Sequence, residues 1–139
     1  MQAGYSARPL AAKLGIKAGM RVALIHAPDK YLELLAPIPA GVIWVADLAE
    51  GEVDLIQYFT SERAALTRDF LLLKGALRPA GMLWISWPKR AAKVPTDLDE
   101  NIVRQIALDL GLVDVKVAAI DSTWSTLKLV YRLTDRPTG

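Results

Sequence analysis

LGIKAGMRVALI, residues 14–25, is the most informative stretch of this chain. It leads into an apolar run, Arg21–His26, whose aliphatic residues are typical of a strand in a parallel α/β sheet. In many such sheets the first strand is followed by a glycine-rich turn that wraps a cofactor. Here it is followed by HAPDK, residues 26–30, which contains no glycine. The stretch therefore predicts an α/β frame whose usual ligand-binding turn is changed.

The composition indicates one compact domain, residues 1–139. The chain is 53% hydrophobic and 23% charged, which suits a single core. Its formal net charge of +2 is too small to predict a nucleic-acid partner. The absence of cysteine and the single histidine exclude disulfides, thiol catalysis and multi-histidine metal sites, so we predict no metal. No apolar run reaches the roughly 20 residues of a membrane span, and we expect a cytoplasmic protein with no membrane partner. We expect Met1–Arg8 to be flexible.

Hydrophobic periodicity predicts six strands and four helices in one continuous order. The predicted strands are Arg21–His26, Val42–Asp47, Val53–Phe59, Met82–Trp87, Val113–Val117 and Leu127–Leu133. The predicted helices are Pro9–Leu14, Lys30–Leu35, Glu62–Leu77 and a fourth that begins in Thr96–Asp99 and ends at Gly111.

Polar and turn-forming residues predict where these elements begin and end. Ser61 is the expected cap of the third helix, which Pro79–Gly81 should stop. Thr96–Asp99 resembles a capping box at the start of the fourth helix. The last two strands, joined by Asp121–Ser125, should form an antiparallel hairpin. The pattern predicts a minimal Rossmann-like, mostly parallel sheet of about six strands with that hairpin at its C-terminal end.

The orientation of the second strand stays open at this point. The connection Leu48–Glu52 spans at most about 18 Å, whereas returning along a six-residue strand takes about 20 Å. A parallel second strand therefore needs frayed ends, and an antiparallel one is the alternative. If the strand is parallel, the sheet order is 2-1-3-4-6-5, with a switch point between the first and third strands.

Three segments and the hairpin resemble class I S-adenosylmethionine-dependent methyltransferases. The segments are Gly19–Val22, Asp54–Ile56 and Leu77–Ser86. Over its whole length the chain also resembles a family of short bacterial proteins known only as a domain of unknown function. That second resemblance rests on SWPK at 86–89, KVPTDL at 93–98 and VDVKV at 113–117, and it implies no activity.

The chain departs from the methyltransferase pattern at the ligand-binding turn. The glycines of that family let the backbone approach the methionine group, because glycine has no Cβ. His26, Ala27 and Pro28 are expected to crowd this position, and Pro28 also removes a backbone donor. The family usually has a strand and helices where this chain has only Leu48–Glu52. We therefore predict no cofactor, with S-adenosylmethionine or a nucleotide as the alternative.

Ligands of open α/β sheets bind beyond the carboxyl ends of the strands, near the switch point. The polar and aromatic residues expected there are His26, Asp47, Tyr58, Thr60, Ser86 and Trp87. Asp47 takes the place of the acidic residue that holds ribose in the methyltransferases, and its alternative role is that of a turn residue. His26 is the one histidine, and its alternative is a strand-end imidazole bonded to backbone. A Ser86–His26 catalytic pair is rejected, because the strand between them separates the backbones by roughly 9–10 Å.

Two further groups of residues are candidates for binding. Lys89, Arg90 and Lys93 form a basic loop before the helix that starts near Thr96, which favours an anion site. The alternative is a solvated loop that the acidic first turn balances. Trp84, Trp87 and Trp124 could wall a pocket for a planar ligand, although core packing is the commoner role.

The second strand carries an interface prediction. Its residues from Val42 through Ala46 contain no charge or proline to protect a sheet edge, and exposed apolar surface of this kind marks interfaces. We therefore predict a homodimer through this edge or the adjoining face.

Three functional classes follow from the sequence. The first is a non-catalytic or regulatory protein-interaction module on a degenerate methyltransferase-like frame. The second is a binding protein for a nucleotide or adenosyl compound, and the third is an active methyltransferase. A binder requires a concave pocket near His26, Asp47 and Ser86, and an enzyme requires titratable groups within bonding distance there.

Overall fold

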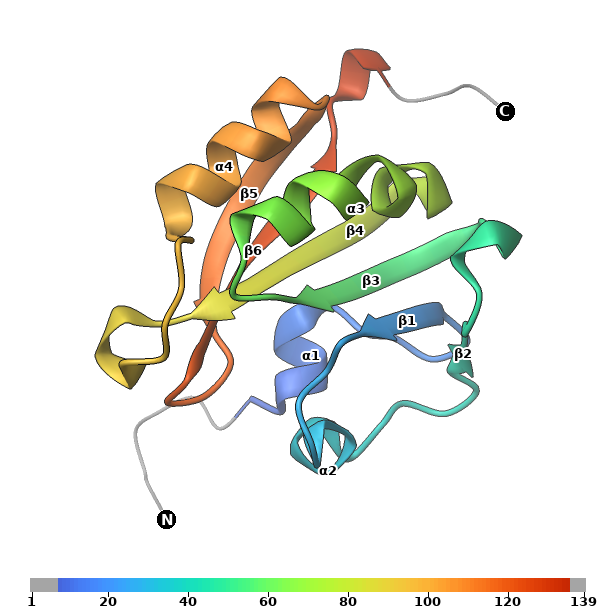
Figure 1. Cartoon of the computed structure of the whole chain (residues 1–139). Coiled ribbons are helices and arrows are strands. Elements are labelled where there is room, and N and C mark those ends of the chain that lie inside the picture. The colour runs from blue at the N-terminus through green and yellow to red at the C-terminus, as the bar shows by residue number, and fades with distance from the viewer. Residues whose placement is uncertain (1–7, 136–139) are drawn as a thin grey trace.

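Six strands form one mixed sheet in the order β2-β1-β3-β4-β6-β5 (Figure 1). The computed structural model of the protein describes residues 8–135. The segment expected to be flexible, Met1–Arg8, lies outside the described residues except for Arg8. The strands are β1 Arg21–Ile25, β2 Ile43–Trp44, β3 Val53–Phe59, β4 Leu77–Pro88, β5 Leu112–Ala119 and β6 Trp124–Tyr131. β1 to β4 are parallel and β6 is antiparallel to both β4 and β5. The predicted α/β fold and strand order are confirmed.

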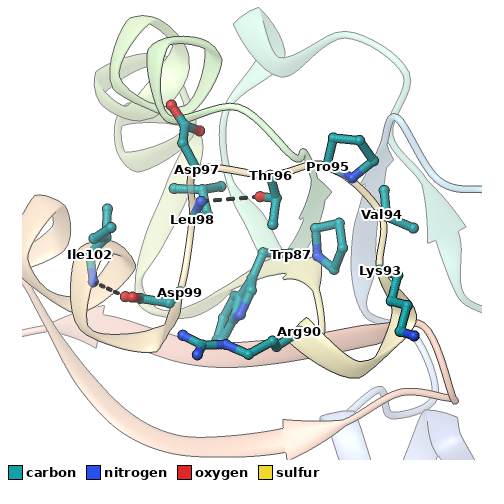
Figure 2. Close-up of a pocket in the computed structure, with 11 residues that line it drawn as sticks. Trp87, Arg90, Lys93, Val94, Pro95, Thr96, Asp97, Leu98, Asp99 and Ile102 are labelled. Carbon is teal, nitrogen blue, oxygen red and sulfur yellow. Dashed lines mark hydrogen bonds between the residues drawn. The ribbon is translucent and has the colours of Figure 1, made fainter.

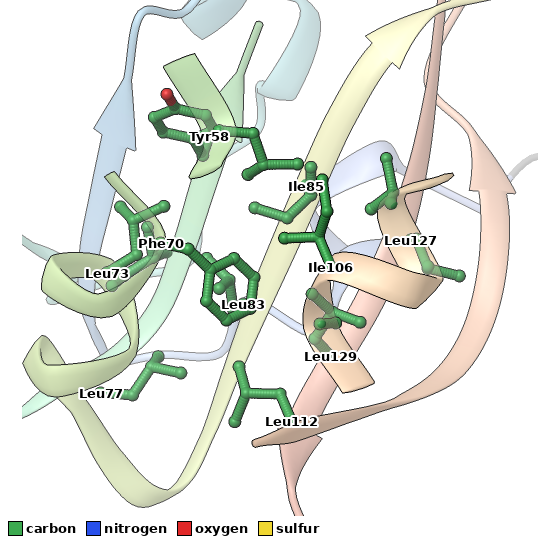
Figure 3. Packing of buried hydrophobic residues seen from close by; sticks show 14 of the residues in the cluster. Tyr58, Phe70, Leu73, Leu77, Leu83, Ile85, Ile106, Leu112, Leu127 and Leu129 are labelled. Atoms are coloured by element: carbon green, nitrogen blue, oxygen red, sulfur yellow. The ribbon is translucent and has the colours of Figure 1, made fainter. Parts of the chain in front are cut away.

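Helices cover both faces of the sheet, as Figure 1 shows. α1 Leu10–Leu14 and α2 Tyr31–Leu35 pack on one face, and α3 Arg63–Ala76 and α4 Glu100–Asp109 pack on the other. Short 3-10 turns, η1 Leu48–Glu50, η2 Arg90–Ala92 and η3 Leu133–Asp135, complete the chain. The larger core lies between the sheet and α3 and α4, where Phe70, Leu83 and Leu129 are buried (Figure 3). The smaller core includes Trp84, whose indole N–H donates to the carbonyl of Leu14 at 2.9 Å.

β2 is much shorter than the predicted strand Val42–Asp47. Only Ile43 and Trp44 pair, with Arg21 and Val22 of β1. The chain leaves the sheet because Asp47 Oδ1 accepts the backbone N–H of Ala49 at 2.9 Å and so opens η1. η1 returns the chain to the amino edge of the sheet. Because β2 ends at Trp44, the return to Val53 has eight residues, 45–52, instead of five, and a parallel β2 is possible.

The helix starts are capped by different residues from those predicted. α3 begins at Arg63, whose N–H donates to Asp97 Oδ1 at 2.7 Å. Ser61 contributes its backbone carbonyl, which accepts the Thr96 hydroxyl and the N–H of Asp97. α4 begins after Asp99, whose Oδ1 accepts the N–H of Ile102 at 2.8 Å. Asp99 is therefore the N-cap residue of α4, and not the N3 residue of a capping box that starts at Thr96. These polar contacts join the loop before α4 to the start of α3.

β4 begins directly at the end of α3, so Pro79–Gly81 lies inside a strand and not in a helix stop. At Gly81 the backbone passes very close to β3. A Cβ there would lie 3.0 Å from the carbonyl oxygens of Arg78 and Val53. Gly75 of α3, by contrast, has no atom within 4 Å of the same position.

We expect substitution by alanine to have opposite effects on the free energy of unfolding at Gly81 and at Gly75. We expect Gly81→Ala to lower the free energy of unfolding by about 1–3 kcal/mol, because backbone oxygens cannot move aside as a side chain would. Gly75→Ala should raise it by up to about 1 kcal/mol, because alanine favours the helix. Urea denaturation of both variants measures the difference. A neutral Gly81→Ala would contradict the close packing of β3 and β4.

Candidate functional site

Two hollows flank the carboxyl edge of the sheet. The first, of about 520 Å³, lies between the end of β4, the loop that follows it and the start of α4 (Figure 2). We call it the β4–α4 hollow. Its lining residues are Trp87, Pro88, Arg90, Lys93, Val94, Pro95, Thr96, Asp97, Leu98, Asp99 and Ile102. The second, the β1–α2 hollow, has about 420 Å³ and is lined by Leu24, Ala27, Pro28, Lys30, Tyr31, Leu32 and Glu33.

The β1–α2 hollow lies beside the turn that the sequence marked as crowded. His26 and Lys30 have left-handed backbone conformations, with φ of 59° and 65°. Residues other than glycine and asparagine adopt such angles at a cost of about 1–2 kcal/mol. The angle at His26 directs its ring to Tyr58, with ring centroids 5.5 Å apart, and His26 does not line the hollow. The space next to Ala27 and Pro28 therefore stays open.

α2, which borders this hollow, is held in place by a hydrogen bond to β3. The Tyr31 hydroxyl donates to Gln57 Oε1 at 2.5 Å, inside the smaller core. Burial raises the pKa of Tyr31 far above its ordinary value, so the phenol is a permanent donor here. Gln57 is the central polar residue of β3 and is fully buried. Through this bond, β3 holds α2 and the turn before it in place.

A cluster of titratable groups lies where β3 meets α3. The Tyr58 hydroxyl donates to Asp69 Oδ2 at 2.6 Å, and Arg68 forms two hydrogen bonds to the same carboxylate. The Arg68 contact, followed by that of Tyr58, lowers the pKa of Asp69 below its ordinary value. Burial, with Asp69 beside it, raises the pKa of Tyr58. Sequence reasoning missed Arg68 and Asp69, because they lie on a helix and only tertiary packing brings them to Tyr58.

Asp47 and Ser86 do not join His26 at one pocket. Asp47 caps η1 and belongs to a chain segment that returns toward the amino edge. The Ser86 side chain is fully buried and donates to Thr126 Oγ1 at 2.9 Å. Thr60 is partly buried, and its hydroxyl accepts the N–H of Glu62 at 3.1 Å. The expected single cleft at the strand ends is thus replaced by two separate hollows.

The predicted tryptophan and basic residues are divided between core and surface. Trp87 is 5% exposed and lines the β4–α4 hollow, whereas Trp84 is completely buried. Trp124 packs edge-on against Phe59 at 5.1 Å. Of the predicted anion-binding residues, Arg90 and Lys93 line the β4–α4 hollow and Lys89 does not.

The predicted interface residues lie at the β2 edge of the sheet. Trp44 is 44% exposed and its neighbour Ile43 is 50% exposed. Val42 is partly buried against the smaller core. Within residues 8–135 no group of three or more metal-ligating side chains is arranged to hold an ion, and no helix there is long and apolar enough to cross a bilayer.

Comparison with solved structures finds the fold of methyltransferases. The chain is similar to an S-adenosylmethionine-dependent methyltransferase from Aquifex aeolicus, with a TM-score of 0.61 and 16% identity over 86% of each chain. A TehB-like methyltransferase from Corynebacterium glutamicum gives 0.56 and 13% identity over 94% of this chain and 91% of that one. No family model and no curated protein matches the sequence.

A further similar structure overturns the prediction of no cofactor for this chain. Magnesium protoporphyrin IX methyltransferase from Synechocystis PCC 6803 is similar in its S-adenosylhomocysteine-bound form, with a TM-score of 0.56 and 14% identity over 88% of this chain and 78% of that one. The same enzyme also matches in its S-adenosylmethionine-bound form. The prediction relied on crowding by His26, Ala27 and Pro28. Ala27 and Pro28 line the β1–α2 hollow, whereas the His26 ring packs on Tyr58 and does not line it. The chain therefore has the fold of S-adenosylmethionine-dependent methyltransferases.

The contacts of Asp69 with Arg68 and with Tyr58 predict how stability depends on pH. Because the pKa of Asp69 is lower in the folded state, its contribution is present at neutral pH and is lost as the pH falls below about 4. We expect Asp69→Asn to flatten this acid limb in urea denaturation. Tyr58→Phe should cost about 1 kcal/mol at pH 7. Asp109→Asn, at an exposed position of α4, is the control, and an equal effect there would contradict the assignment.

Proposed function

We propose that this chain binds a small adenosyl compound, of the S-adenosylmethionine and S-adenosylhomocysteine class, in the β1–α2 hollow. The observation that carries the proposal is the left-handed turn at His26 and Lys30, which keeps a hollow open directly beyond the first strand. This is the position at which open α/β sheets bind ligands, because the connections after β1 and β3 leave on opposite faces.

The lining of the hollow fits part of such a ligand. Leu24, Ala27, Pro28 and the ring of Tyr31 provide apolar walls for a flat base, and binding sites are usually apolar with a few polar groups. Lys30 and Glu33 are the polar groups at the rim. Asp47, the expected ribose partner, is engaged as the cap of η1. The ribose would therefore be held by Glu33 or by backbone groups of the turn.

A thermal-shift series tests this proposal. A ligand at a hundredfold excess over its Kd adds about 2.7 kcal/mol of stability, so S-adenosylmethionine or S-adenosylhomocysteine should clearly raise the melting temperature. Ala27→Leu places a larger side chain in the hollow and should abolish the shift. Ala64→Leu adds the same side chain at an exposed position of α3 and should leave the shift intact. No stabilisation by either compound, or an equal shift in Ala27→Leu, would refute adenosyl binding.

A non-catalytic protein-interaction role is a second proposal, supported by the β2 edge. Ile43 and Trp44 are about half exposed on a strand that, among the residues described by the structure, forms the edge of the sheet. Unpaired edge strands and exposed apolar side chains favour association. The occupant that we propose is a second copy of this chain, so that the ligand site and the contact surface are separate parts of one regulatory module. The membership in a short bacterial family, the cytoplasmic location and the absence of a nucleic-acid partner stay predictions.

Light scattering over a range of protein concentrations measures the association. We expect a dimer that Trp44→Glu converts to a monomer, because a charge at the edge opposes pairing. Leu71→Glu introduces the same charge at a side chain of α3 that is 61% exposed, and this control should stay dimeric. A monomer at all concentrations, or equal dissociation in both variants, would exclude the β2 edge as the contact.

A further inference from the structure

We infer that the β4–α4 hollow is a separate binding site for an organic carboxylate with an apolar, ring-sized body. The hollow shares no lining residue with the β1–α2 hollow, and the inference does not depend on adenosyl binding. It rests on an apolar floor, on the Arg90 guanidinium, which forms no ion pair with any residue that the structure describes, and on two carboxylates that accept hydrogen bonds from helix starts.

The floor of the hollow is apolar and rigid. Trp87 and Leu98 are each 5% exposed, and both pack into the larger core behind the hollow. Ile102, Val94 and Pro95 form walls that are more open to solvent. A volume of about 520 Å³ is within the range of small-molecule sites. This surface suits the apolar body of a ligand, since its burial releases water from both partners.

Two cations line this hollow and form no ion pair with its acidic residues. Arg90 and Lys93 are exposed and form no ion pair within residues 8–135. In Figure 2 the Arg90 side chain extends beside Trp87, while Lys93 lies at the far rim. Arg90 thus presents a planar group with several donors next to the floor. A guanidinium matches the geometry of a carboxylate, to which it donates two parallel hydrogen bonds.

The acidic residues of the hollow are occupied by the ends of helices. Asp97 Oδ1 accepts the N–H of Arg63 at the start of α3, and Asp99 Oδ1 accepts the N–H of Ile102 in α4. Figure 2 shows the Asp97 carboxylate directed toward α3 and away from Arg90. Both carboxylates keep their negative charge, but neither forms an ion pair with Arg90. Because these carboxylates occupy the helix starts, the group that attracts an anionic ligand is Arg90.

Carboxylate is the anion class that these features favour over phosphate. The hollow offers one guanidinium next to apolar surface, and a singly charged planar anion loses less hydration there than a dianion does. Lys93 at the rim adds long-range attraction and no fixed contact. Binding should therefore need both the charge and the ring of the ligand.

Benzoate, benzyl alcohol and phenyl phosphate are suitable probes, titrated into the whole chain and followed by NMR shifts of the Trp87 indole. We expect benzoate to bind at least tenfold more tightly than the other two. Arg90→Met keeps the apolar stem and should weaken benzoate at least tenfold. Lys89→Met removes a neighbouring charge that does not line the hollow and should have no effect. Val94→Trp, at a side chain that is 41% exposed, should block the hollow without disturbing the core.

The outcomes separate this inference from the others. Equal binding of benzyl alcohol, tighter binding of phenyl phosphate, or equal losses in Arg90→Met and Lys89→Met would each overturn the carboxylate site. Ala27→Leu, which should abolish adenosyl binding, should leave benzoate binding unchanged. Shifts that are lost in Ala27→Leu would place the probe in the β1–α2 hollow and would also overturn the inference.

Discussion

The burial of β3 on both faces is the constraint that organises this molecule. Of its seven residues only Asp54 retains partial exposure, and the others are buried at 0 or 1%. Ile56 and Tyr58 face α3 and α4, whereas Leu55 and Phe59 face α1 and α2. A strand of this kind is stable only if both helical layers are present, because apolar side chains on either face would otherwise meet water. The short helices α1 and α2 are therefore necessary parts of the fold.

The same constraint explains how the turn after β1 is held. α2 contains five residues, and an isolated helix of this length is unstable in water. It persists because Tyr31 reaches Gln57 inside the smaller core, with Phe59 packed edge-on at 4.9 Å. Packing of this kind can maintain left-handed angles at two side-chain-bearing residues. The altered turn thus keeps a defined shape without glycine, since β3 fixes the helix that follows it.

The strand order and helix positions follow from local patterns, so the sequence predicts them well. Val53–Phe59 is predicted to the residue because its apolar run is bounded by charged and polar residues. Features that depend on tertiary partners are predicted poorly. The stop of β2 depends on the Asp47 cap, and the start of α3 depends on Asp97, which lies 34 positions away from Arg63. Neither contact is visible in a hydrophobic pattern.

The candidate site was also predicted poorly, because its geometry depends on tertiary partners. Sequence reasoning placed His26, Asp47 and Ser86 in one cleft, since all three follow or end parallel strands. Three contacts separate these residues. The His26 ring packs on Tyr58, Asp47 caps η1, and the Ser86 hydroxyl donates to Thr126 of β6. β6 pairs with the side of β4 that faces away from β3 and the switch point, and its Thr126 accepts the buried Ser86 hydroxyl. The accessible space lies at two separate places along the edge, next to Ala27 and next to Arg90. Two hollows with different linings remain because Tyr58 and Ser86, in the middle of the edge, are buried.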